Sequence, residues 1–224
     1  MEISLIYITL TITGLLIIYA AIPFHTLLST RKYEDPKERK EVLNYGDSKL
    51  YILGGELEPN FWGDFITSFD SSPVEHLELI FGPRLIIEKQ KYDKYIHLYL
   101  EKGKLPEPND CQWLDCHPVL SYFNNNPNKI TLYLKNSHNE DERHFSVGNK
   151  KNVCIEDPHG QNLPGGGIIS RGDDYLYQKK MSEFNRIKKC MDFCTEFERH
   201  NAHLLFSMIK FEYKVIGDNL NENI

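Results

Sequence analysis

Four side chains capable of acid–base or metal-binding chemistry lie close together in the second half of the chain: His144, Glu156, Asp157 and His159. Two strand-like segments, 144–147 and 152–156, flank the polar, glycine-containing stretch 148–151 and predict a β-hairpin. A hairpin returns its second strand beside the start of its first. We therefore expect these four side chains to meet in a concave site at one end of a sheet.

Two imidazoles and two carboxylates could bind a divalent metal or form an acid–base pair around a phosphate. The alternative is a polar strand end, in which 157–158 and 159–160 are ordinary turn residues. Phosphate chemistry also needs cations that stabilise the charge of the transition state. We expect that role of the basic residues nearest in sequence: Arg143, Lys150, Lys151 and Arg171. No cofactor and no metal ligand set is assigned.

The elements around the hairpin predict an α/β fold. Strands are expected at 49–57, 75–80, 129–134 and 209–215, and helices at 61–69, 91–101 and 174–201. The last helix carries an apolar stripe along its whole length, and the last strand alternates as if half-buried. Strands alternating with helices predict an α/β sandwich with a mixed sheet.

The first residues of the chain have a different composition. From residue 3 to 22 they are almost wholly apolar, long enough as a helix to span roughly 30 Å of hydrocarbon. No basic n-region and no good cleavage site mark this stretch as a signal peptide. We expect a transmembrane anchor over 1–28, a mixed-charge juxtamembrane linker over 29–48, and one domain over 49–218.

Charge and cysteine usage indicate the orientation of this anchor. Lys and Arg follow the apolar run and do not precede it, which places the N-terminus outside and the domain in the cytoplasm. Five cysteines, an odd set in a chain of this size, fit reduced thiols. The net charge is −6, with 32 acids against 26 Lys plus Arg, so general nucleic-acid binding is not expected. The expected partner is the lipid bilayer, through residues 3–22.

The order of elements and the His-initiated hairpin resemble one half of a phospholipase D-like domain, over residues 49–170. That family's motif is His-x-Lys-x-x-x-x-Asp, with the His as nucleophile and the Lys holding phosphate oxygens. His144 takes the nucleophile's position, whereas Ser146 stands for the Lys and Lys151 for the Asp. The family's Gly-Ser-x-Asn segment is absent. The resemblance implies a degenerate single half-domain, which needs a second copy to complete a two-His site.

Two functions follow from these observations. The first is a single-pass membrane protein whose non-catalytic cytosolic domain binds a partner protein or an anionic ligand at the membrane. The alternative is a membrane-tethered phosphodiesterase, a nuclease or phospholipase, with His144 as nucleophile, His159 as general acid and Glu156 as the third catalytic residue. The missing Lys and Asp of the motif favour the first.

Overall fold

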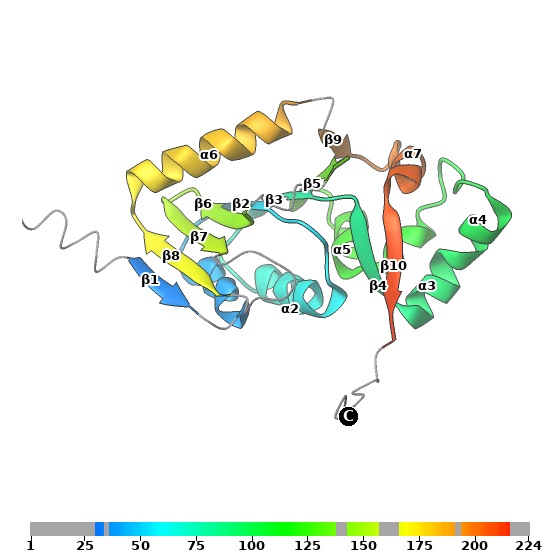
Figure 1. The fold of residues 1–224 in the computed structure, drawn as a ribbon, viewed down its shortest axis with the longest axis horizontal. Helices are drawn as coiled ribbons and strands as arrows, with labels where there is room; N and C mark the ends of the chain where they lie inside the picture. The colour runs from blue at the N-terminus through cyan, green and yellow to red at the C-terminus, as the bar shows by residue number, and fades with distance from the viewer. Residues whose placement is uncertain (1–29, 34–35, 138–142, 157–165, 191–193, 216–224) are drawn as a thin grey trace, which may run out of the picture.

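One mixed sheet of eight strands organises the computed structural model of the chain (Figure 1). The structure describes residues 30–33, 36–137, 143–156, 166–190 and 194–215. The strands are β1 (Thr30–Tyr33), β2 (Lys49–Leu53), β3 (His76–Phe81), β4 (Arg84–Glu88), β5 (Ile130–Lys135), β6 (Phe145–Gly148), β7 (Asn152–Glu156), β8 (Gly167–Arg171), β9 (Cys194–Phe197) and β10 (Lys210–Lys214). The α-helices are α2 (Pro59–Asp70), α3 (Lys89–Tyr95), α4 (His97–Lys102), α5 (Pro118–Asn125), α6 (Asp174–Lys188) and α7 (Ala202–Leu205). Three 3-10 helices are η1 (Pro36–Asn44), η2 (Gln112–Cys116) and η3 (Phe206–Met208).

The strand order in the main sheet is β1-β8-β7-β6-β2-β3-β5-β9. Strands β2, β3 and β5 are parallel, and the strands on both sides of them pair antiparallel. Outside this sheet, β4 and β10 form a parallel pair of their own. The predicted α/β architecture with a mixed sheet is therefore confirmed.

Helices cover both faces of the sheet. On one face, α2 and α5 pack with the larger core, which includes Trp113, a fully buried residue of η2. Helix α6 lies across the opposite face, as Figure 1 shows. Its Phe184 is 0% exposed and meets the Tyr51 ring edge-on at 5.5 Å. The two apolar faces of the central strands are thus both covered, as is typical of parallel strands.

The long C-terminal helix predicted over 174–201 is wrong beyond residue 188. Helix α6 ends at Lys188, and Cys194–Phe197 forms β9, antiparallel to β5 at the edge of the sheet. Cys194 belongs to the core under α6, whereas Phe197 belongs to the core on the other face. Their spacing fitted a helical stripe, but an edge strand buries the same two side chains on opposite faces.

Other predicted elements differ in detail. The helix expected over 91–101 is two short helices, α3 and α4, which meet at the buried Ile96. The final strand pairs with β4 and not with the main sheet, so most of its side chains are exposed where half-burial was expected. The predicted strands at 75–80 and 129–134 and the helix at 61–69 are confirmed within one or two residues.

The segment expected to be a juxtamembrane linker contributes to the domain. Within 29–48, β1 pairs antiparallel with β8, and η1 packs against α2 and β7. Tyr33, Val42 and Leu43 are each at most 3% exposed. Part of the expected linker therefore belongs to the sheet, because β8, which was not predicted either, offers β1 a pairing partner.

A buried carboxylate fixes the hairpin that carries the predicted site. Asp47, 0% exposed, accepts a hydrogen bond from Asn152 Nδ2 at 2.6 Å and another from the backbone N–H of Lys150. A Cβ added to Gly148 would lie 2.1 Å from Asp47 Oδ2, so only glycine allows this close approach. The turn of the hairpin is thereby held to the chain just before β2.

The predicted membrane anchor lies outside the described residues. Among the helices that the structure does describe, none combines the length and the apolar composition needed to cross a bilayer.

We expect two N-terminal truncations to differ sharply. Removal of residues 1–28 leaves every described strand in place, so thermal unfolding followed by circular dichroism should remain cooperative. Removal of residues 1–48 deletes β1, η1 and Asp47, and should abolish cooperative unfolding, because each buried side chain lost from this segment contributes about 1.5–3 kcal/mol. Equal unfolding midpoints for the two truncated chains would contradict the inclusion of the N-terminal segment in the fold.

Candidate functional site

The hairpin brings His144 and Glu156 together. Strands β6 and β7 pair antiparallel, with Ser146 opposite Cys154, and the Glu156 N–H donates to the His144 carbonyl at 3.0 Å. The side chains also meet: His144 Nδ1 lies 2.9 Å from Glu156 Oε2. The contact that the sequence led us to expect between these two residues is present, and a carboxylate at Nδ1 fixes the orientation of the imidazole.

A third residue joins this pair from a distant part of the chain. The Arg39 guanidinium in η1 donates to Glu156 Oε1, so that the two carboxylate oxygens bind one partner each. Arg39 also interacts with the Tyr33 phenol. The side chains of His144, Glu156 and Arg39 are only 21%, 16% and 24% exposed. The result is a largely buried cluster in which one acid lies between two basic groups.

This environment keeps Glu156 ionised. Burial alone would raise its pKa, but the hydrogen bond from His144 and the charge of Arg39 outweigh burial and lower the pKa to about 2. Deeper in the same face, the Cys154 thiol donates to the Tyr33 hydroxyl at 3.6 Å, and burial raises the pKa of both groups. Cys154 is therefore a neutral thiol at physiological pH, and the negative charge of the cluster lies on Glu156.

The structure separates the residues predicted to bind phosphate. Arg143 is exposed and adjacent to His144. Lys150 and Lys151 lie in the hairpin turn, and Arg171 is paired in register with Asn152 beside that turn. At about 3.3 Å per residue, the turn is roughly 13 Å along the strand from His144. An antiparallel hairpin places its turn and its free ends at opposite ends, so three of the four predicted cations do not reach the imidazole.

Two of these three cations interact elsewhere. Lys151, at φ 68°, forms an ion pair with Asp174 at 2.8 Å, and the Arg171 guanidinium lies 4.0 Å from the centroid of the Tyr45 ring. At the position of the motif lysine, Ser146 is 7% exposed and belongs to the buried face of β6. Two further predicted residues, Asp157 and His159, lie outside the described residues.

Sequence reasoning missed Arg39 and did not single out Lys135. Arg39 is 117 residues from Glu156 in sequence, and its basic neighbourhood was interpreted as a topology signal, so no local pattern could have assigned it. Lys135 ends β5, and burial lowers its pKa to about 8, with Cys194 near it acting in the opposite direction. A lysine that closes an apolar strand is the sequence signal that was available.

Within the described ranges, no three or more His, Cys, Asp or Glu side chains are grouped so as to hold a metal ion. All five cysteines are free thiols.

Comparison with known proteins finds likeness in structure only. No family profile matches the sequence, and no curated protein matches it either. Among solved structures, the chain is similar to Nuc from Salmonella typhimurium, a phospholipase D family member. The identity is 8% and the TM-score is 0.45, over 76% of this chain and 98% of that one.

A second similar structure is the polyphosphate kinase of Porphyromonas gingivalis. Here the identity is 12% and the TM-score is 0.37, over 81% of this chain and 23% of that one. These two structures are what the chain is similar to, and its chemistry depends on its own residues.

The lowered pKa of Glu156 predicts an acid-sensitive contribution to stability. This contribution is present above the unfolded pKa of about 4.5 and is lost as the pH falls toward about 2. It amounts to about 3 kcal/mol of unfolding free energy. Glu156→Gln should lower stability at pH 7 and flatten the dependence between these pH values, measured by urea unfolding.

The exposed Glu196→Gln is the matched control and should keep the wild-type pH profile. If the unfolding free energy of Glu156→Gln varied with pH in parallel with that of the wild type, the cluster would not hold the carboxylate ionised.

Proposed function

We propose that this chain is a single-pass membrane protein whose cytosolic phospholipase D-like α/β domain binds a partner protein or an anionic ligand at the membrane without catalysing a reaction. The proposal that the domain is not catalytic rests on where the charged side chains lie relative to His144. A buried, neutral serine stands where the motif has its phosphate-binding lysine, and Lys150, Lys151 and Arg171 lie at the other end of the hairpin.

Electrostatics supports this proposal. Transfer of a phosphoryl group to an imidazole develops negative charge that must be stabilised by groups already in place. Arg39 is near enough, but its guanidinium is bound to the Glu156 carboxylate, which largely neutralises it. The same cluster suits recognition, because a fixed, ionised and partly exposed group of this kind holds its geometry without any reaction.

The position of β1 supports action at the membrane. The apolar run ends at residue 22 and the sheet begins at Thr30. Even a fully extended chain spans at most about 3.6 Å per residue, so the domain would stay within roughly 30 Å of the anchor. Most of the cations that follow the run are paired within the fold: Arg31 binds Glu38 and Glu41, both at 2.6 Å. The same cations can set the topology during membrane insertion and form ion pairs once the domain has folded.

Fractionation tests the anchoring. The full chain expressed in cells should remain in the membrane pellet after alkaline carbonate extraction, whereas the chain lacking residues 1–28 should be in the supernatant, because only the former has a segment that spans the bilayer. Labelling of Cys111 and Cys190 with an impermeant maleimide should require cell lysis. Recovery of the full chain in the carbonate supernatant would refute the anchor, and labelling in intact cells would refute the orientation.

One observation favours the alternative, a phosphodiesterase. The Nδ1 contact of His144 with Glu156 orients the imidazole, and its Nε2, which points away from the carboxylate, is buried. In that reaction Nε2 would form a bond to phosphorus, and the departing alkoxide would take a proton from a general acid. His159 was predicted for that role.

Hydrolysis of bis(p-nitrophenyl) phosphate separates the two functions. Under the proposal, the wild-type chain releases no more p-nitrophenolate than His144→Ala does, with EDTA or with added Mg²⁺, Mn²⁺ or Zn²⁺. The exposed His97→Ala is the matched control. Saturable wild-type turnover that His144→Ala abolishes and His97→Ala retains, with unchanged unfolding midpoints, would overturn the non-catalytic proposal in favour of the enzyme.

A further inference from the structure

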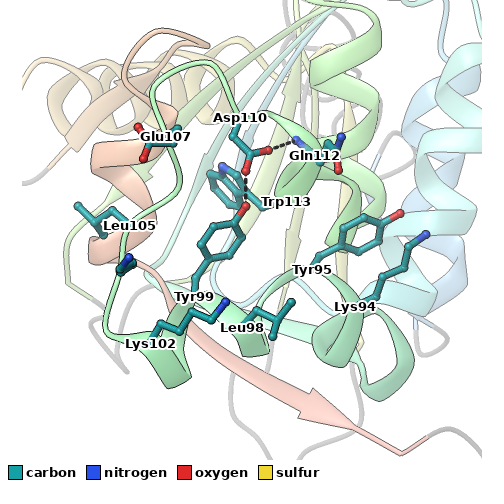
Figure 2. A pocket seen from close by; sticks show the side chains of 11 residues that line it. Lys94, Tyr95, Leu98, Tyr99, Lys102, Leu105, Glu107, Asp110, Gln112 and Trp113 are labelled. Atoms are coloured by element: carbon teal, nitrogen blue, oxygen red, sulfur yellow. Dashed lines mark hydrogen bonds between the residues drawn. The ribbon is translucent and has the colours of Figure 1, made fainter.

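A groove of 420 Å³ lies between α3, α4 and the loop that leads to η2 (Figure 2). Its lining includes the side chains of Leu98 and Tyr99 from α4, Leu105 from the loop and Trp113 from η2. In Figure 1, α3 and α4 lie at the opposite end of the molecule from the β6–β7 hairpin. The volume is in the range of sites that bind small molecules.

The walls of this groove are fixed by hydrogen bonds. Gly103 ends α4 at φ 59°, with its N–H donating to the carbonyls of Leu100 and Tyr99. The Tyr99 hydroxyl then donates to Asp110 Oδ2, which joins the helix to the far side of the loop. The other Asp110 oxygen accepts from the Gln112 N–H at 3.1 Å. A ligand would therefore enter a site that is already formed, and would lose less free energy to ordering.

The innermost lining residue, Trp113, is held rigidly by the aromatic core. Trp113 is 1% exposed, and its ring packs edge-on against Phe206 at 5.1 Å and Phe211 at 6.1 Å. Its buried Nε1–H has no hydrogen-bond partner within the described part of the chain. The indole ring lines the groove, so its emission should report on a ligand bound there.

The mouth of the groove combines positive charge with apolar surface. Lys94, Lys102 and Lys104 line it, and neither Lys102 nor Lys104 forms an ion pair in the described structure. Leu98 and Leu105 are 52% and 47% exposed. Three lysines outnumber the two acids of the lining, Glu107 and Asp110, of which Asp110 already accepts two hydrogen bonds.

We propose that this groove binds a small amphiphilic anion: a phosphate monoester or carboxylate that carries an apolar group. The anionic head interacts with Lys102 and Lys104. The apolar part packs on Leu98, Leu105 and the Tyr99 ring. This inference goes beyond the proposed function, because the groove shares no residue with the His144 cluster and can bind whether or not that cluster is catalytic.

Tryptophan fluorescence of the full chain tests this inference, with hexyl phosphate as the probe. The chain has two tryptophans, so Trp62→Phe leaves Trp113 as the only indole. In that background, hexyl phosphate should change the emission saturably, with a Kd on the order of 0.1–1 mM for a ligand of this size. Inorganic phosphate lacks the apolar chain and hexanol lacks the anionic head. Each should therefore bind at least roughly tenfold more weakly than hexyl phosphate.

Charge-matched variants identify the site. Lys102→Ala/Lys104→Ala should weaken hexyl phosphate binding roughly three- to tenfold, as expected for two exposed ion pairs. Lys179→Ala/Lys189→Ala removes the same charge from exposed positions of α6 and its C-terminus and should leave the Kd unchanged. Equal Kd values for the two double variants, or an emission change that does not saturate, would overturn the inference.

Discussion

The carboxylate of Glu156 is the interaction on which the candidate site depends. It joins three parts of the chain: the end of β7, the residue that precedes β6, and η1. One buried acid between His144 and Arg39 keeps its charge because both neighbours compensate for the water it has lost. Removal of either basic neighbour would leave the buried charge of Glu156 under-compensated. The ends of the hairpin and the N-terminal segment are thus linked through this carboxylate.

The N-terminal segment therefore has two roles. It begins close after the apolar run, and it also supplies the edge strand β1, which pairs with β8, and the helix η1, which packs against β7. Because the sheet begins at Thr30, the proposed anchor would hold the domain close to the bilayer.

The lysines beside the hairpin turn and the lysines of the groove lie in separate parts of the molecule. The hairpin places His144 at one end and its turn lysines at the other, where Lys151 is paired with Asp174. A different set of lysines lines the groove beside α4, together with exposed leucines and the buried Trp113 indole. The groove offers an anion both charge and apolar contact, whereas the His144 cluster is already internally neutralised.

The sequence by itself determined the local elements whose signals are short-range. Alternation and turn residues were enough for the β6–β7 hairpin and for its consequence, the contact of His144 with Glu156. Tertiary structure decided what depends on distant partners. Cys194 and Phe197 fit a helical stripe equally well, and only the free edge of β5 makes them a strand. Arg39 reaches Glu156 across 117 residues because β8 pairs with β1, a long-range contact that no local pattern encodes.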